Sequence, residues 1–317
     1  MRPSAARAQS DADPAISSRR QALRVLLGHG EAITSGPETF SYDGRPYRGT
    51  FERDPGGAVV NVVDLEAYLA SVVSREMPPS WPPAALQTQA ICARTYVLQR
   101  SDPRRSYDLV PSELDQVYDG VAGETPGGAA AVAATAGGVL KYGVEFARVA
   151  YSSCCGGHTE SAADAWGNQS LPYLSGVVCP WCQDSPNYRW SRTLGFDAMA
   201  ARFAASLPPA GALQDLRVTG RDASGRARAF ELVTSAGDAI VSGSTFRQTI
   251  GARVLPSLLV TGLARSPEGD GVVVDGGGLG HGVGLCQWGA RGMALSGAGA
   301  GQIAAFYFPG TIVDYLE

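Results

Sequence analysis

The first clear feature of the chain is a helical spacing of apolar residues in DLEAYLASVVSRE, residues 64–76. Five of them fall on one face of a helix: Leu65, Tyr68, Leu69, Val72 and Val73. Asp64 is suited to cap the first turn, and Pro78 excludes Met77 from helical geometry. The pattern therefore predicts an amphipathic helix that ends near Glu76.

Two further helices are predicted downstream. One starts at the Pro82–Pro83 pair, where proline is tolerated in the first helical turn, and continues through ALQTQAICARTYVLQR to residue 100. The other is the small-residue segment GGAAAVAATAG, residues 127–137. Residues 102–128 carry proline and glycine at both ends and are predicted to form a loop.

Alternating apolar and polar residues predict strands on both sides of these helices. ALRVLL (22–27) has the pattern of a buried strand, and residues 40–62 that of a short β-meander. A strand pair is expected around VLKYG and ARVAYSS, and more antiparallel sheet between about 190 and 275 in ARAFELVT, AIVSG and GVVVDG. Helices scattered among hairpins indicate an α+β fold with mixed and antiparallel sheet. We expect a single domain over 21–317 after a disordered tail, residues 1–20.

Composition narrows the possible partners. The 317 residues carry a formal net charge of −4, with a pI near 5.5 and no cationic block, so nucleic acid is not an expected ligand. The longest apolar stretches are far below the roughly 18–20 residues that span a bilayer. The first residues lack the apolar core of a secretory signal, so no export signal is visible.

Two segments concentrate aromatic, amide, charged and glycine residues more than a core or a turn needs. They are SREMPPSWPPAALQTQAICARTYV (74–97) and GLGHGVGLCQWGARGMA (278–294), a composition typical of a polar cleft. The glycines around His281 do not match a nucleotide-binding pattern. His281, Gln287 and Trp288 could bind a sugar through imidazole, amide and indole. The alternative is a strand–turn–helix junction with Trp288 in the core.

Glu76 is the candidate acid. It continues the apolar face of its helix and lies in the last turn, where burial and the helix dipole would both raise its pKa. A carboxyl group that stays protonated near neutral pH can act as a general acid. The alternative is a helix-end glutamate paired with Arg75 or Arg94. On the next helix, Gln89 and Arg94 could bind sugar hydroxyls or hold Glu76. Their alternative roles are a surface amide and an arginine that caps a carbonyl.

The six cysteines are of two kinds. Cys92 and Cys286 lie in apolar patterns and are interpreted as small core residues. The others form CCGGH followed by CPWC, a spacing typical of a structural zinc site. The candidate ligands are Cys154, Cys155, His158, Cys179 and Cys182. A disulfide, for example Cys155 to Cys182, is the main alternative. There are two further alternatives. The cysteines could be reduced structural thiols, or Cys154 or Cys155 could form a cysteine–histidine hydrolase pair with His158 or His281.

Together with YSSCCGGHTESAADAWG (151–167), the two polar segments resemble the signature blocks of the SpoIID/LytB family, in the same order along most of the chain. The resemblance implies a peptidoglycan lytic transglycosylase with Glu76, in an EMP motif, as its catalytic acid. It also implies glycan contacts from Tyr151, Ser152 and Ser153, location outside the cytoplasm, and zinc in some members.

In such enzymes the muramyl 6-hydroxyl closes onto the anomeric carbon, so the second carboxylate that most glycosidases need is dispensable. The resemblance equally allows a non-catalytic enhancer that binds glycan and stimulates an N-acetylmuramoyl-L-alanine amidase. The sequence does not separate these two functions.

Overall fold

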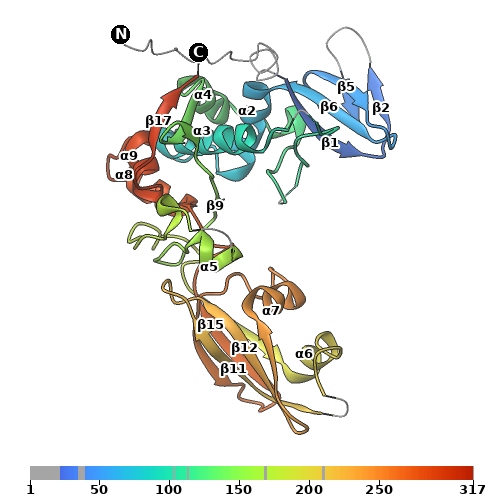
Figure 1. The fold of residues 1–317 in the computed structure, drawn as a ribbon, viewed down its shortest axis with the longest axis vertical. Coiled ribbons are helices and arrows are strands. Elements are labelled where there is room, and N and C mark those ends of the chain that lie inside the picture. The colour runs from blue at the N-terminus through green and yellow to red at the C-terminus, as the bar shows by residue number, and fades with distance from the viewer. Residues whose placement is uncertain are drawn as a thin grey trace, which may run out of the picture. The chain divides into compact units, whose positions relative to one another are not determined.

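A computed structural model describes residues 22–34, 40–102, 104–112, 114–167, 170–208 and 211–316. The predicted tail over 1–20 lies outside them, and the prediction of a single domain stays a prediction. The chain divides into two compact units, Met1–Pro79 with Val97–Ala136, and Ser80–Tyr96 with Gly137–Glu317. Short helices and antiparallel sheets occur in both, which confirms the α+β class (Figure 1).

The first unit is built on two small antiparallel sheets. Their orders are β1-β6-β5 and β2-β3-β4. The strands are β1 (Ala22–Gly28), β2 (Ala32–Thr34), β3 (Phe40–Tyr42), β4 (Arg45–Tyr47), β5 (Thr50–Arg53) and β6 (Val59–Asp64). These elements confirm the predicted first strand and the meander. Its helices are α2 (Leu65–Glu76), η1 (Gly120–Gly123) and α4 (Pro126–Ala134).

Helix α2 forms as its sequence predicts. The Asp64 carboxylate accepts hydrogen bonds from the backbone N–H groups of Glu66 and Ala67, and Met77 ends the helix in extended geometry. All five residues of the predicted stripe are buried. Since β6 runs directly into α2, the apolar face of the helix is anchored to the sheet at its first residue.

The second half of α2 packs closely on neighbouring backbone. A Cβ atom at Gly128 of α4 would collide with the Ser74 hydroxyl, and one at Gly123 of η1 would collide with the Ser71 hydroxyl. The Thr125 hydroxyl, which caps α4, lies 2.8 Å from the Ser74 hydroxyl. Because these glycines remove side-chain bulk, the end of α2 that carries Glu76 is held on two sides.

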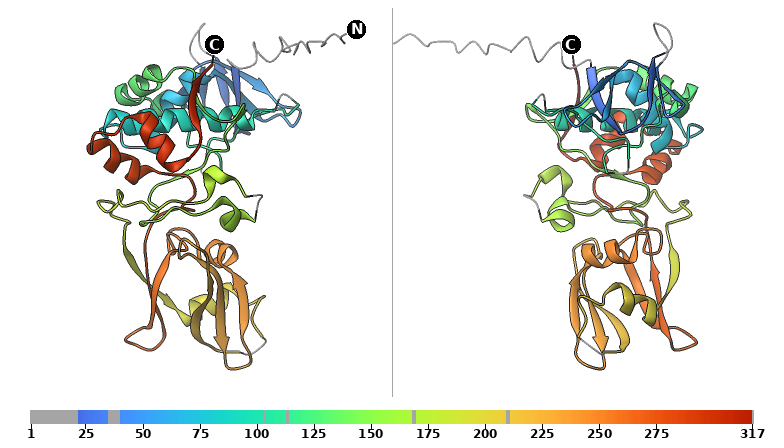
Figure 2. Two further views of the ribbon diagram at one scale, coloured as in Figure 1. Left: turned by 60° about the vertical axis from the view of Figure 1, so that its left-hand side comes forward. Right: turned by 90° about the vertical axis from the view of Figure 1, so that its right-hand side faces the viewer.

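The second unit contains a β-rich module over residues 190–276, seen from further directions in Figure 2. Its antiparallel sheets have the orders β10-β15-β14 and β11-β12-β13. The strands are β10 (Trp190–Gly195), β11 (Leu213–Arg221), β12 (Ala227–Thr234), β13 (Ala239–Ser242), β14 (Val260–Arg265) and β15 (Gly271–Gly276). Helices α6 (Phe196–Arg202) and α7 (Gly243–Ile250) accompany them. The antiparallel sheet predicted here is confirmed.

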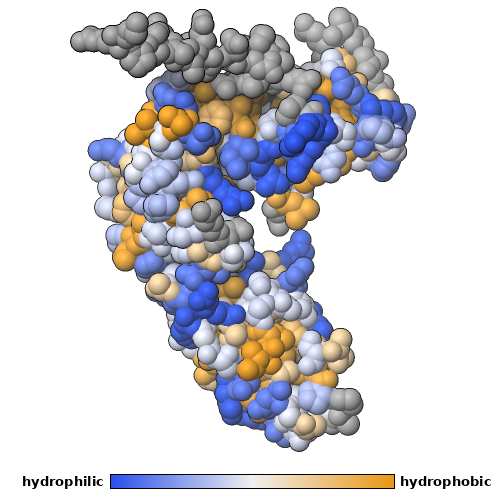
Figure 3. All heavy atoms as spheres, viewed as in Figure 1, coloured by the Kyte–Doolittle hydropathy of each residue, from blue (hydrophilic) through white to orange (hydrophobic). Residues whose placement is uncertain are grey.

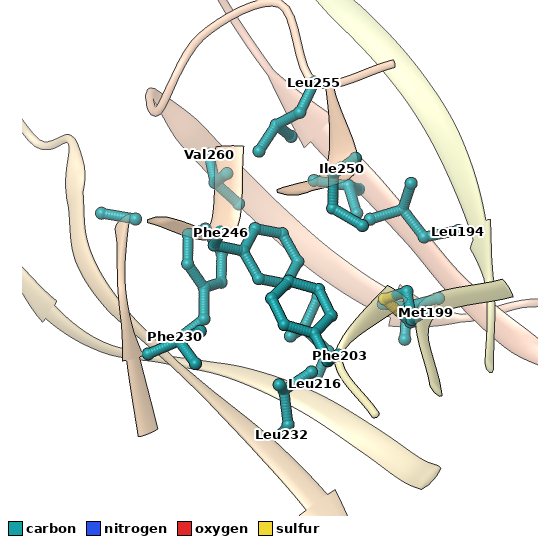
Figure 4. Close-up of a cluster of buried hydrophobic side chains, with 14 of the residues drawn as sticks. Leu194, Met199, Phe203, Leu216, Phe230, Leu232, Phe246, Ile250, Leu255 and Val260 are labelled. Atoms are coloured by element: carbon teal, nitrogen blue, oxygen red, sulfur yellow. The ribbon is translucent and has the colours of Figure 1, made fainter. Parts of the chain in front are cut away.

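The core of this module is aromatic at its centre. Phe246 of α7 stacks on Phe230 of β12, with ring centroids 4.1 Å apart, and on Phe203, 5.3 Å away (Figure 4). Leucine, valine and methionine side chains from both sheets surround these rings. On the face shown in Figure 3, a hydrophobic patch lies over the region of β12, framed by hydrophilic residues. The module therefore has an apolar core of its own within the second unit.

The rest of the second unit carries the signature segments. Its elements are α3 (Pro83–Arg100, whose last residues belong to the first unit), β7 (Gly138–Tyr142), β8 (Glu145–Phe146), β9 (Tyr151–Ser152), α5 (Ala162–Trp166), η2 (Pro172–Leu174), β16 (Leu285–Cys286), α8 (Gln287–Leu295), α9 (Ala300–Tyr307) and β17 (Ile312–Tyr315). No helix in the described ranges combines the length and the apolar character needed to cross a membrane.

One predicted strand pairing is confirmed only in part. The strand pair expected around 139–143 and 147–153 begins as β7 with the two-residue β8, and Ala147 N–H donates to the Leu140 carbonyl oxygen at 2.9 Å, while the other edge of β7 pairs with β17. Tyr151 and Ser152 pair instead with Leu285 and Cys286, in a parallel bridge to β16. The hydrogen-bond partner of β9 is more than a hundred residues away, so local alternation could not indicate it.

Candidate functional site

Glu76, the candidate acid, is the last residue of α2 in the first unit and is half-buried. The backbone N–H of Val117 donates to its Oε1 at 3.3 Å. The neighbouring Arg75 pairs with Asp119, with 2.8 Å between Nε and Oδ2. The segment 115–119 therefore fixes both the carboxyl group of Glu76 and the charge beside it.

An amide pair joins the two polar segments inside the second unit. Gln287, the first residue of α8, donates from Nε2 to Oε1 of Gln89 on α3 at 3.4 Å. Both side chains are buried. Nε2 of Gln89 has no hydrogen-bond partner among the described residues. A buried donor of this kind is costly unless a ligand or water satisfies it, so the pair has the character of a binding group.

Trp288 lies beside this pair and is half-buried rather than in the core. Its ring contacts Trp81 edge-on, with centroids 5.0 Å apart, and the Arg291 guanidinium lies 5.2 Å from its centroid. Two indoles and a cation next to buried amides could hold the apolar face and the hydroxyls of a sugar.

The strand pair β9–β16 brings the serine block next to the same helix. Tyr151 is opposite Leu285, Ser152 is opposite Cys286, and the Ser153 carbonyl accepts a hydrogen bond from Trp288 N–H at 3.0 Å. The Ser152 hydroxyl is buried and has no partner in the part of the chain that is described. Gln89, Gln287, Trp288 and the 151–153 block thus form one group.

Arg94 is fully buried in the second unit. Its Nη1 donates to the carbonyl oxygen of Gly138 at 2.9 Å, which ties α3 to the start of β7. Carbonyl capping, the alternative role considered for Arg94, is therefore present in the structure.

The cysteines form a buried thiol cluster, defined here as Cys155, Cys179, Cys182 and Cys286. Their Sγ atoms all lie within 4.8 Å of one another. Tetrahedral zinc with Zn–S bonds of about 2.3 Å requires sulfur atoms about 3.8 Å apart, and the Cys155 and Cys182 sulfurs are 3.6 Å apart. The donor set is thus of the right type and size for a soft divalent cation.

The thiols of this cluster have pKa values shifted in opposite directions. Hydrogen bonds from Cys155 and then Cys182 hold the pKa of Cys179 well below its ordinary range, while burial raises the pKa of Cys286 far above it. A buried group of thiols cannot all ionise together, because the charges would repel. A bound cation would remove that penalty.

No disulfide is formed, and all six cysteines are free. The set at metal-binding distance also differs from the predicted ligands. Cys286, interpreted from sequence as a core residue, completes it. Cys154 lies next to the cluster, with its Sγ 4.0 Å from the Cys182 carbonyl, and His158 Nδ1 lies 2.6 Å from the Thr159 carbonyl. Burial of Cys154 and Cys155 gives a substrate no access, which disfavours the cysteine hydrolase alternative.

Close packing holds α8 against the thiol cluster. A Cβ atom at Gly289 would lie 2.8 Å from the Cys179 sulfur and would collide with the Tyr307 hydroxyl. That hydroxyl is itself 3.1 Å from the same sulfur. Cys286 is the N-cap of α8, and its Sγ accepts from the Gly289 N–H at 3.3 Å. The thiol cluster therefore sets the start of the helix that carries Gln287 and Trp288.

His281 lies between Tyr151, to whose backbone it hydrogen-bonds, and Trp166 of α5, with the His281 and Trp166 ring centroids 5.3 Å apart. Its Nδ1 accepts from the Val283 N–H at 2.9 Å, an acceptor role open only to the neutral ring. Burial lowers its pKa to about 4, and the charges of Arg226 and Arg247 act in the same direction. His281 is thus a neutral histidine at physiological pH.

This shift predicts a pH dependence of stability. The folded pKa lies below the unfolded value of about 6.5, so the contribution of His281 is present above pH 6.5 and is lost as pH falls toward 4. His281→Gln should weaken the fall in Tm between pH 6.5 and 4 relative to the unchanged protein. His29→Gln, at an exposed histidine, is the control; an identical pH profile for all three proteins would refute the assignment.

Comparison with known proteins identifies the family. The model for stage II sporulation protein, SpoIID, matches residues 54–142, which include Glu76, Gln89 and Arg94. An uncharacterised protein of Brachyspira hyodysenteriae is 32% identical over 81% of this chain and 68% of its own length. Stage II sporulation protein D of Bacillus subtilis is 29% identical over 81% of the chain and 76% of its own length. The chain belongs to the SpoIID/LytB family.

Two further matches of this SpoIID/LytB chain include residues beyond those that match the SpoIID model. The amidase enhancer of Bacillus subtilis is 27% identical over 93% of the chain and 49% of its own length. A domain of unknown function (DUF8618) matches residues 182–284, the range of the β-rich module and of His281. The family resemblance inferred from the three sequence blocks is confirmed.

Sequence reasoning missed several residues that the structure places in or beside these groups. Cys286 had a visible signal, since a cysteine sits in the same block as Gln287 and Trp288. Trp81 lay within the first polar segment but was given no role. Arg226 had no local signal in the sequence. Its buried guanidinium donates to the carbonyl oxygens of Cys155 and His158, at 2.8 and 3.0 Å. Through these bonds the β-rich module holds the cysteine segment in place.

Proposed function

We propose that this SpoIID/LytB protein is a lytic transglycosylase that cleaves the β-1,4 bond between N-acetylmuramic acid and N-acetylglucosamine in peptidoglycan glycan strands. The observation that carries the proposal is Glu76 itself, a half-buried carboxyl group fixed at the end of α2 within the residues that match the SpoIID model. Proteins that act on the cell wall work outside the cytoplasm, and we propose this location for the protein.

The reaction needs a single carboxyl group acting twice. Glu76 donates its proton to the glycosidic oxygen as the bond from that oxygen to the anomeric carbon breaks. The carboxylate then accepts the proton of the muramyl 6-hydroxyl, whose oxygen bonds to the same anomeric carbon. No water is consumed, and the product carries a 1,6-anhydro end.

We assign the glycan contacts to the group in the second unit that Gln89, Gln287, Trp288 and residues 151–153 form. Gln89, Gln287 and Ser152 offer amide and hydroxyl groups, with two buried polar atoms still lacking a partner among the described residues. Trp288, with Trp81 at its edge, offers an aromatic surface. Tyr151 and Ser153 flank them on the β9 segment, where Ser153 holds the Trp288 backbone.

Removal of the Trp288 indole tests this assignment. Trp288→Ala should weaken binding of peptide-free glycan strands by about tenfold and raise KM, with little loss in Tm because the ring is half-buried. Tyr315→Ala, at an exposed aromatic residue on β17, is the matched control. A large fall in Tm with unchanged KM would instead show that Trp288 is a packing residue.

The thiol cluster is proposed to hold one structural zinc ion. Four protein sulfur ligands leave no open position for substrate, so the ion would stabilise the fold rather than take part in cleavage. Cys155, Cys179, Cys182 and Cys286 are the ligands. Cys154 and His158, which were also predicted as ligands, lie outside this set.

An amidase enhancer is the second candidate function. The observation that favours it is the match to a protein named amidase enhancer along 93% of this chain. In that case the group around Gln287 and Trp288 binds glycan without cleavage and an N-acetylmuramoyl-L-alanine amidase is the partner.

Digestion of purified sacculi separates the two functions. The sacculi are digested with and without prior amidase treatment, and the lytic transglycosylase releases 1,6-anhydromuramyl products in at least one of these conditions. The enhancer releases none and instead increases the rate at which an added amidase frees stem peptides.

A further inference from the structure

A pocket of about 820 Å³ lies within the second unit, between α5, α7 and the glycine-rich loop. Its walls come from Asp164 and Trp166 of α5, from Arg247 and Gln248 of α7, and from His281. The volume falls within the range of about 300–1,000 Å³ that is typical of ligand sites. None of the residues assigned to glycan contact above, His281 aside, lines it.

The aromatic wall of this pocket is accessible. Trp166 is 44% exposed, although its ring contacts the His281 ring. Solvent exposure of a large aromatic side chain at a pocket wall is typical of stacking against an apolar ligand face.

The polar lining is charge-balanced. Asp164 pairs with Arg228, with 2.9 Å between Oδ1 and Nη2. The Arg247 guanidinium donates to the carbonyl oxygens of Leu255 and Pro256, which fixes it in the wall. Asp222 is occupied by its own turn, where it accepts from Ser224 and Arg226. Arg247 and Asp222 carry opposite charges, and Glu160 pairs with Arg226, so the formal charges of the lining cancel.

Glu160 adds a buried group to the same wall. Its side chain is about 6% exposed, and its Oε2 lies 3.4 Å from Nε of the equally buried Arg226. The exposed Ser244 hydroxyl and the Gln248 amide, which line the same pocket, can both donate and accept hydrogen bonds.

An aromatic face surrounded by amide, hydroxyl and balanced charged groups suits an uncharged, hydroxyl-rich ring rather than an anion or a metal. We propose that the pocket formed by α5, α7 and His281 is a second saccharide site, which binds the uncharged N-acetylglucosamine unit of a glycan strand. The identity of the sugar rests on the proposed function; the existence of the site does not rest on chemistry at Glu76.

Binding of chitotetraose to the full chain tests the proposal, with all variants in a Glu76→Gln, Trp288→Ala background so that no cleavage intervenes and the group around Trp288 contributes little binding. Isothermal titration should show Trp166→Ala weakening the affinity by about tenfold. Gln248→Ala, at an exposed position that leaves the fold intact, should weaken it by a smaller factor. Trp181→Ala, also a partly exposed tryptophan but outside the pocket, should match the parent.

Hydrogen exchange locates the site independently. Saturating chitotetraose should protect backbone amides of α7 and of residues 162–167. Protection confined to 285–295, or unchanged affinity in both Trp166→Ala and Gln248→Ala, would overturn the second site. Failure of the transglycosylase proposal has a different signature, the absence of 1,6-anhydro products from sacculi treated with the unchanged protein.

Discussion

Glu76→Gln is expected to abolish glycan cleavage while the protein stays folded. Glutamine keeps the shape of the side chain and can still accept the Val117 N–H, but it cannot release a proton to the leaving oxygen. Positioned acid catalysis contributes about 10² to 10⁴ in rate, and here the same group also serves as the base. We therefore expect kcat to fall by at least about a thousandfold.

Glu66→Gln is the matched control, because Glu66 lies on the same helix, in its first turn. Its loss removes one favourable interaction with the helix dipole and should cost less than about 1 kcal/mol, with kcat unchanged. Binding of glycan strands by Glu76→Gln should remain close to that of the unchanged protein. If Glu76→Gln cleaves at the normal rate, Glu76 is not the acid.

Cys286→Ala is expected to remove the metal. Protein purified under reducing conditions should contain about one zinc per chain, and the variant should contain almost none, since a three-thiolate site holds the ion far less tightly. Because Cys286 also caps α8, Tm should fall by roughly 5 °C or more. Elemental analysis and a melting curve measure the two effects.

Cys154→Ala discriminates the ligand set seen in the structure from the one expected from spacing. Cys154 is equally buried and adjacent in sequence to a ligand, so the substitution creates a comparable void. It should nevertheless retain zinc, as should His158→Ala. Loss of zinc in Cys154→Ala together with full retention in Cys286→Ala would show that the predicted ligands are the true ones.

Local patterns were sufficient for much of the fold. The stripe from Leu65 to Val73 with its Asp64 cap predicted α2, and the Pro82–Pro83 pair predicted the start of α3 at Pro83, because these signals act within one or two turns of helix. The strands of the β-rich module followed from alternation alone. By contrast, the pairing of β9 with β16 depends on residues 134 apart, which no local period encodes.

The difference between local and long-range signals also explains which site residues the sequence could predict. Composition picked out the blocks that hold Gln89, Gln287 and Trp288, and the structure brings these residues together. It could not indicate that His281 contacts Trp166 as well as the Tyr151 backbone, because only the path of the glycine-rich loop brings His281 to α5. Cys286 was given a core role because its neighbours in sequence are apolar, whereas its partners in the thiol cluster come from the 155–182 segment.

The most direct test of the account is the mass of the soluble products released from purified sacculi by this protein alone. The account predicts muropeptides or glycan fragments that end in 1,6-anhydro-N-acetylmuramic acid, present with the unchanged protein and absent with Glu76→Gln. Fragments with ordinary reducing ends, or no glycan fragments together with faster peptide release by an added amidase, would contradict it.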